Sequence, residues 1–215
     1  MRYLIVCGGK IDKEFGLNEI KTDGIDAIIA ADSGMDFLYE NSVTPDIIVG
    51  DFDSATTKAL EFFERKGQTE IHRLNPIKDD TDTEYAIRLA ISEGARSIVM
   101  LGATGSRIDH VLGNISLLGI GLESKTDISI IDTNNRIRMS DKPVTIEKSA
   151  QYGRVVSHIT YTLSLVNFCL KGFKYPVTDY SFDRFTSLGI SNEIVDDHAL
   201  IDIHRGKFII IESKD

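Results

Sequence analysis

Short runs of apolar residues alternate with segments of helical periodicity along the first half of the chain. This alternation is typical of parallel strands that are joined by crossover helices. It predicts strands at residues 3–7, 27–31, 46–49, 70–74 and 97–101, and helices at residues 34–39, 55–66, 83–93 and 108–122. We therefore expect an α/β fold with an open, mostly parallel sheet and flanking helices.

The pattern changes after about residue 124, where runs rich in β-branched residues are separated by glycine and proline. Strands are expected at residues 128–132, 144–146, 155–162, 199–204 and 207–212, and no long helix is indicated. This favours a small all-β sandwich or barrel as a second domain. The change of period alone places an α/β domain at residues 1–125 and the all-β domain at residues 126–215.

Composition narrows the classes of function. The 215-residue chain has 24 Lys and Arg residues against 33 Asp and Glu residues, a formal net charge of −9, which disfavours nucleic-acid binding. Its two cysteines, Cys7 and Cys169, allow neither a disulfide framework nor a four-thiolate zinc site. Neither a membrane-spanning apolar run nor a signal-peptide layout is present, so we expect a cytoplasmic protein that binds no membrane.

Aspartates follow the predicted parallel strands, in loops that lead into the next helix. They are Asp32, Asp51, Asp53, Asp79, Asp80, Asp82 and Asp109. Because the carboxyl ends of parallel strands meet at one edge of a sheet, these side chains are expected to crowd together. Hard carboxylate oxygens suit Mg²⁺, which also binds phosphate oxygens. The two dense clusters, Asp51 with Asp53 and Asp79 with Asp82, are therefore the predicted metal ligands.

Cationic and glycine-rich segments in the same loops predict a partner for that ion. Lys10, Lys78 and Arg107 can neutralise a polyphosphate, and the glycine-rich turn at residues 102–106 lets backbone N–H groups approach an anion. The predicted phosphate-binding residues are Lys10, Lys78, Thr104, Gly105, Ser106 and Arg107. Asp32, in the loop after the second predicted strand, is assigned to the same group. A simpler alternative is helix capping, because Ser33–Asp36, Thr81–Glu84 and Ser106–Asp109 all match a capping box.

In order along the chain, these motifs resemble those of bacterial thiamine pyrophosphokinases. The matching segments are ADSG (31–34), PDIIVGDFDS (45–54), KDDTDTE (78–84), GATGSRIDH (102–110), KGFKYP (171–176) and SLGISNE (187–193). The resemblance covers essentially the whole chain. It implies an α/β domain followed by a β-sandwich, and transfer of pyrophosphate from ATP to thiamine with Mg²⁺, giving thiamine diphosphate and AMP.

The resemblance also assigns roles to residues. The family's acidic catalytic positions correspond to Asp51, Asp53, Asp79, Asp82 and Asp109. Arg107 matches the family's basic position, and Ser191 and Asn192 match its thiamine-side motif. That motif meets the α/β domain of the partner subunit in the family, which implies a homodimer with the site at the subunit interface. Asp82 and Asp109 stay alternative acceptors for the hydroxyl proton.

Three alternatives stay open at this point. Residues 154–162 depart from the family pattern and the chain has no Trp, so the acceptor could be another heteroaromatic alcohol such as a pterin. The run ending in Asp51-Phe52-Asp53 also allows a haloacid-dehalogenase-type phosphatase with Asp51 as the covalent nucleophile. The third alternative is a nucleotide-binding module without turnover. Incubation with Mg-ATP and candidate alcohols, followed by detection of AMP rather than ADP, separates them.

Overall fold

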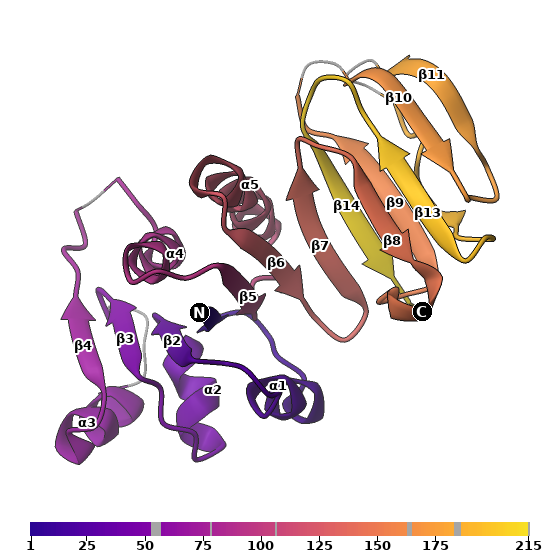
Figure 1. The fold of residues 1–215 in the computed structure, drawn as a ribbon. Helices are drawn as coiled ribbons and strands as arrows, with labels where there is room; N and C mark the ends of the chain where they lie inside the picture. Colours follow the sequence, from indigo (N-terminus) through magenta and orange to yellow (C-terminus); the bar gives the residue numbers. More distant parts are fainter. Residues whose placement is uncertain (53–56, 78, 106, 163–164, 183–185, 215) are drawn as a thin grey trace. The chain divides into compact units, whose positions relative to one another are not determined.

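The structure is a computed structural model that describes residues 1–52, 57–77, 79–105, 107–162, 165–182 and 186–214. It consists of two compact units, Met1–Thr133 and Asn134–Asp215 (Figure 1). The first is an α/β unit and the second is an all-β unit. The fold class predicted from the sequence is therefore confirmed.

A parallel sheet forms the centre of the first unit, in the order β6-β5-β1-β2-β3-β4. Its strands are β1 (Arg2–Val6), β2 (Ala27–Ala31), β3 (Ile47–Gly50), β4 (Glu70–Arg73), β5 (Ser97–Leu101) and β6 (Asp127–Ile131). The helices are α1 (Lys13–Ile20), α2 (Gly34–Glu40), α3 (Thr57–Lys66), α4 (Asp82–Ser92) and α5 (Ile108–Ser124). Figure 1 shows α4 and α5 on one face of the sheet, and α1, α2 and α3 on the other.

Burial on both faces explains why strands β1, β2, β3 and β5 of this sheet are largely apolar runs. Leu4 and Val6 of β1, Ala30 of β2 and Ile48 of β3 lie in one core cluster with Phe63 of α3. All five are at most 1% exposed. The rigid sheet fixes where each strand ends, and the loops at those ends carry the candidate site.

The predictions for this unit miss one helix. Helix α1 begins after Asp12, whose carboxylate accepts a hydrogen bond from the N–H of Phe15 at 2.9 Å. The helix has only eight residues, and its central Gly16 weakens the helical signal. Packing requires this glycine, because a Cβ there would lie 2.6 Å from the side chain of Ile11 and 2.7 Å from that of Phe37.

The boundary between the units also differs from the expected position. It lies after Thr133 rather than after residue 125. Strand β6, which we had assigned to the all-β domain, pairs parallel with β5, for example through Ile128 beside Ile98. A single β-branched run looks alike whether its neighbours are parallel or antiparallel, so its sequence alone did not indicate which sheet it joins.

The second unit contains two sheets, in the orders β12-β9-β14-β7 and β11-β10-β13-β8. The strands are β7 (Asn135–Ser140), β8 (Val144–Glu147), β9 (Val155–Thr160), β10 (Leu165–Lys171), β11 (Val177–Phe182), β12 (Asn192–Glu193), β13 (His198–Asp202) and β14 (Phe208–Ser213). All pairings between them are antiparallel. Val156, Phe208 and Ile210 of the first sheet share a core with Phe168 and Ile201 of the second, which makes the unit a sandwich.

Strands β7, β10, β11 and β12 were not predicted. Strand β7 carries Arg136 and Arg138, charges that mask its alternation. Strands β10 and β11 each contain a residue with positive φ, Asn167 at 51° and Asp179 at 49°, and their pairing shifts register. Such irregular strands lack the strict period of two that a sequence pattern reports.

Gly34, the first residue of α2, controls how closely this helix approaches β1. A Cβ at this position would lie 2.0 Å from the carbonyl oxygen of Val6. We expect Gly34→Ala to lower the free energy of unfolding by about 2 kcal/mol in urea titrations, because the rigid backbone cannot yield. Gly113 in α5 has open space around its Cβ position, so Gly113→Ala is the control and should raise stability by up to about 1 kcal/mol. Equal effects would contradict the packing argument.

Candidate functional site

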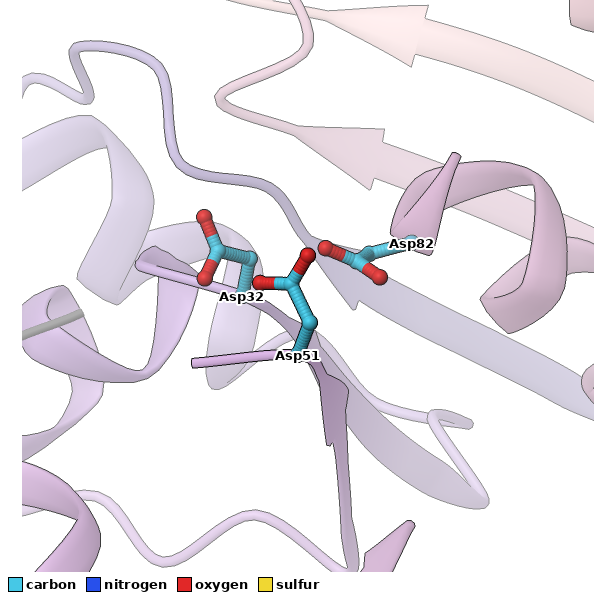
Figure 2. Close-up of side chains that lie close together, drawn as sticks. All are labelled: Asp32, Asp51 and Asp82. Carbon is cyan, nitrogen blue, oxygen red and sulfur yellow. The ribbon is translucent and has the colours of Figure 1, made fainter. Parts of the chain in front are cut away.

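Three aspartates meet at the carboxyl-terminal edge of the parallel sheet. Asp32 follows β2, Asp51 follows β3, and Asp82 is the first residue of α4. One carboxylate oxygen from each lies within 4.8 Å of the other two. Figure 2 shows the three side chains close together on separate elements, with the carboxylates of Asp51 and Asp82 facing each other. This arrangement concentrates negative charge at one point.

Local backbone geometry aims these side chains. Asp32 has a positive φ of 48°, and its N–H donates to the carbonyl of Val49 at 2.8 Å. Asp82 stands at the amino terminus of α4, where the helix dipole favours a negative charge. The cap of that helix is Thr81, whose hydroxyl accepts from the N–H of Glu84 at 3.2 Å. The predicted capping role of Thr81 is thus confirmed, and Asp82 lies beyond the cap.

The other two predicted capping boxes have different outcomes. The side chain of Ser33 forms no capping hydrogen bond to α2 among the described residues. Ser106 lies outside the described residues, and the residue that precedes α5 is Arg107. Helix capping therefore accounts for one of the two motifs that the described residues test. It does not account for the convergence of Asp32, Asp51 and Asp82.

The electrostatics of Asp32 favour a bound cation. Burial raises the pKa of this carboxyl, the charges of Asp82 and Asp51 raise it further, and hydrogen bonds from Ser33 partly oppose the shift. Its Oδ1 atom is buried and has no hydrogen-bond partner among the described residues. A buried, unpaired carboxylate oxygen is costly unless a cation compensates it. Three hard oxygen ligands at this spacing fit a divalent ion such as Mg²⁺.

A cavity of about 490 Å³ extends from the aspartate cluster. Asp32, Asp51 and Asp82 form part of its wall, and much of the remainder is glycine-rich backbone. The loops after β1 and β5 meet there without side chains between them. A Cβ on Gly9 would lie 2.3 Å from the carbonyl oxygen of Gly102 and 2.4 Å from that of Thr104. The cavity is therefore suited to a ligand that binds backbone groups.

The turn after β5 forms one side of the cavity and is held by two side chains. Gly102 has a positive φ of 65°. The amide of Asn114 donates to the carbonyl of Ala103 at 2.8 Å, and the hydroxyl of Thr104 donates to Asp132 at 2.9 Å. Neither Asn114 nor Asp132 was predicted. The available signals were an amide nearly two turns into the helix that follows the glycines, and an acid at the end of a strand.

The structure gathers some of the predicted site residues and not others. Asp32, predicted to bind phosphate, lies in the carboxylate cluster with Asp51 and Asp82 and also lines the cavity. Thr104, Gly105 and Arg107 line the cavity, as do Asp80 and His110. In the described chain, Lys10, Asp79 and Asp109 belong to neither the cluster nor the cavity wall. Asp53, Lys78 and Ser106 lie outside the described residues.

Asp109 has a different partner from the one expected. Its carboxylate accepts from the guanidinium of Arg107 at 2.6 Å, and both side chains are exposed. The hydrogen bond from Arg107, followed by that from the backbone N–H of His110, lowers the pKa of Asp109 to about 2. Such a carboxylate accepts a proton poorly at neutral pH. Arg107 is held at the rim of the cavity with its charge partly neutralised.

The predicted thiamine-side residues lie in the second unit. The backbone N–H of Ser191 donates to the hydroxyl of Ser157 at 3.0 Å. Asn192 is 3% exposed, and its side-chain amide bonds both the N–H and the carbonyl of Tyr175, at 3.0 and 2.8 Å. Asn192 of β12 thus holds the segment that connects β10 and β11. A contact of either residue with thiamine stays a prediction.

The atypical segment 154–162 contains β9 and places one buried polar ring in the sandwich. His158 is 2% exposed, its ring centroid lies 4.7 Å from that of Phe168, and burial lowers its pKa to about 4. Ile159 and Tyr161 of the same segment are 39% and 43% exposed. The departure from the family pattern therefore affects both the interior and the surface of the sandwich.

Family models match both units. A model described as "Thiamin pyrophosphokinase, catalytic domain" matches residues 21–131. A second, described as "Thiamin pyrophosphokinase, vitamin B1 binding domain", matches residues 143–208. The chain belongs to the thiamine pyrophosphokinase family. The resemblance found in the sequence motifs is confirmed.

Other members of the thiamine pyrophosphokinase family resemble the chain over most of its length. The thiamine pyrophosphokinase of Bacillus subtilis (strain 168) is 33% identical over 188 residues, 87% of each chain. The crystal structure of thiamine pyrophosphokinase from Bacillus subtilis superposes with a TM-score of 0.89, 31% identity and full coverage of both chains. That of the Geobacillus thermodenitrificans protein gives a TM-score of 0.86 at 29% identity, covering 100% and 98%. These comparisons do not favour the phosphatase alternative.

None of the helices formed by the described residues combines the length and the apolar character needed to cross a bilayer.

Proposed function

We propose that this protein transfers a pyrophosphoryl group from ATP to the hydroxyl of thiamine, giving thiamine diphosphate and AMP. The observation that carries the proposal is the convergence of Asp32, Asp51 and Asp82 on the wall of a glycine-lined cavity, within the unit that matches the family's catalytic domain. Polyphosphate chemistry needs neutralised oxygens and accurate positioning, and this wall offers ligands for both.

Mg²⁺ is the cofactor we propose for this site. Asp32, Asp51 and Asp82 would hold the ion, and Asp53 and Asp79 stay predicted ligands from the sequence. When bound, Mg²⁺ neutralises charge on the phosphate oxygens and fixes the orientation of the polyphosphate. The support from this chain is the carboxylate spacing of at most 4.8 Å and the buried, unpartnered Oδ1 of Asp32.

The chain's own groups position the substrates. The hydroxyl oxygen of thiamine attacks the β-phosphorus of ATP, and its proton passes to Asp82, the other predicted acceptor. The bond from that phosphorus to the α–β bridging oxygen breaks, and AMP leaves. The turn at Ala103–Gly105 offers backbone N–H groups to the phosphates, and Arg107 adds positive charge at the rim. Because the pKa of Asp109 is about 2, its role is to hold Arg107 rather than to accept the hydroxyl proton.

The acceptor side is proposed from the second unit. The vitamin B1 binding model spans Ser191 and Asn192, which we propose as thiamine-side residues. The negative cavity wall attracts the fixed positive charge of the thiazolium ring. A homodimer with the site at the subunit interface is the assembly we propose with this function. The cytoplasmic location stays a prediction from the sequence.

One incubation tests the proposal. With ATP, Mg²⁺ and thiamine, we expect AMP and thiamine diphosphate to accumulate in equal amounts, and chelation of the metal to stop both. A parallel incubation with a hydroxymethyl pterin tests the alternative acceptor. Accumulation of ADP, AMP formation with the pterin alone, or a phosphorylated aspartate in the protein would each contradict the proposed function.

A further inference from the structure

The turn at Ala103–Gly105 forms part of the cavity wall. Ala103, Thr104 and Gly105 all line it, and Gly105 is exposed. Within the described chain, no hydrogen bond to a protein acceptor is formed by the N–H of any of the three. Successive unpaired N–H groups in a turn form a concavity that binds anions. The donors of this turn are therefore available to a phosphate group.

Two side chains outside the turn form hydrogen bonds to it. Asn114 is the seventh residue of α5, and its Nδ2 donates to the carbonyl of Ala103 at 2.8 Å. Asp132 follows β6, and its Oδ2 accepts from the hydroxyl of Thr104 at 2.9 Å. A third bond, from the N–H of Gly9 to the carbonyl of Gly102 at 2.9 Å, ties the turn to the loop after β1.

The bond to Asp132 also decides what Thr104 can offer a ligand. A hydroxyl has one hydrogen to donate, and in this structure that hydrogen is directed to Asp132. A phosphate oxygen is an acceptor and needs a donor. Thr104 can therefore donate its backbone N–H to the phosphate, while its side chain stabilises the turn.

We propose that Asn114 and Asp132 are positioning residues that hold the Ala103–Gly105 turn so that its backbone N–H groups bind the phosphates of ATP. This inference rests on the proposed function for the identity of the ligand. Beyond the proposed function, it assigns Asn114 and Asp132 an effect on nucleotide affinity that acts through the turn. Thr104 contributes to this site through its backbone and through its bond to Asp132.

The first test compares two asparagines that make the same kind of bond. Asn41 donates from Nδ2 to the carbonyl of Phe37 at 2.8 Å and does not line the described cavity wall, so Asn41→Ala is a matched control for Asn114→Ala. We expect Asn114→Ala to weaken binding of the magnesium complex of α,β-methylene-ATP by about ten-fold or more, because a misplaced turn loses several contacts at once. Asn41→Ala should change it less than about two-fold, although both variants lose one hydrogen bond.

Steady-state kinetics distinguish a positioning role of Asn114 from a loss of stability alone. In the AMP-forming assay, Asn114→Ala should raise KM for ATP and leave KM for thiamine unchanged. Equal nucleotide affinity in the two alanine variants, each with a melting temperature above that of the assay, would overturn the role of Asn114. If Asn114→Ala does not fold, the Asp132 variants below decide the inference.

The second test is a double-mutant cycle between Asp132 and Thr104. Asp132→Leu and Thr104→Val should each weaken binding of the analogue about ten-fold. The double variant should bind no more weakly than either single variant, because both substitutions remove the same hydrogen bond. Asp132→Asn should bind within about three-fold of the unchanged protein, since its amide oxygen still accepts the hydroxyl. Loss of affinity in Thr104→Val with normal affinity in Asp132→Leu would show a direct contact of the hydroxyl with phosphate, and would overturn the proposal.

These outcomes separate the inference from the proposed function. A protein that binds the nucleotide analogue but forms no AMP with thiamine contradicts the proposed function, while the binding series still decides the role of Asn114 and Asp132. A protein that binds no nucleotide analogue in the presence of Mg²⁺ overturns the positioning inference as well.

Discussion

Asp51→Asn is expected to lower the rate of AMP formation at least a hundredfold, about 3 kcal/mol of activation free energy. The substitution keeps the shape of the side chain and removes one of three converging charges. A neutral amide oxygen is a much weaker ligand for Mg²⁺ than a carboxylate. Initial rates at saturating ATP and thiamine measure the loss.

The same substitution should stabilise the protein when no metal is present. Asp51 and Asp82 both raise the pKa of Asp32, which means that the three carboxylates repel one another in the folded state. Removing one charge relieves part of this repulsion. We expect Asp51→Asn to have a higher melting temperature than the unchanged protein in chelator, and a smaller rise in that temperature when Mg²⁺ is added.

Asp80→Asn is the matched control for this experiment. Asp80 lines the same cavity but lies outside the carboxylate cluster of the described residues. Its substitution changes the net charge equally, so we expect a loss of rate of less than about ten-fold. Near-normal turnover in a folded Asp51→Asn variant would remove Asp51 from the metal site. Equal losses in both variants would mean that total charge matters rather than the cluster.

The sequence was sufficient to predict which loops form the site. Parallel strands end at one edge of their sheet, so a strand pattern alone brings Asp51 and Asp82 to the same edge. The pattern does not specify side-chain direction. Asp32 joins the cluster because its backbone adopts a positive φ of 48°, a conformation that the sequence around it did not indicate.

Residues that act through distant partners were the ones that the sequence could not reveal. Asn114 and Asp132 have no motif of their own, and their importance lies in bonds to Ala103 and Thr104. Asp109 was grouped with the other aspartates because it follows the fifth strand. In the structure it pairs with Arg107, two residues away, and this local ion pair keeps it out of the cluster.

The same limitation hid β7 and, with it, the main ion-pair network of the second unit. Arg136 and Arg138 make this strand look like a polar loop. Both pair with Glu212 of β14, which lies beside β7 in the sheet and is 0% exposed. A charged residue can be buried in a strand only when an oppositely charged residue pairs with it. Here that partner is far away in the sequence, so the pattern around β7 does not indicate it.

Glu212→Ala is expected to destabilise the protein by about 3–5 kcal/mol at neutral pH. The carboxylate accepts hydrogen bonds from Arg136 at 2.7 and 2.9 Å, from Arg138 at 2.7 Å, and from the backbone N–H of Tyr152 at 2.9 Å. Alanine would leave two guanidinium groups and one N–H without their acceptor in a largely buried site. Urea titrations of the second unit's unfolding measure the effect.

The effect should shrink as the pH falls. Burial alone would raise the pKa of Glu212, but the hydrogen bonds from Arg136 and Tyr152 and the charges of both arginines outweigh it, so the pKa is lowered. A carboxyl with a lowered folded-state pKa contributes stability above its unfolded value of about 4.3 and loses it as the pH falls through the folded value. The difference in free energy of unfolding between Glu212→Ala and the unchanged protein should therefore narrow once the pH falls below about 4.3.

Glu147→Ala separates this network from a general effect of removing a carboxylate. Glu147 is an exposed residue of β8, so its loss should change the free energy of unfolding by no more than about 0.5 kcal/mol at any pH tested. Glu212→Gln keeps an acceptor without the charge, and we expect its stability to fall between those of the alanine variant and the unchanged protein. Equal stabilities of Glu212→Ala and Glu147→Ala at neutral pH would show that the arginines are satisfied without Glu212.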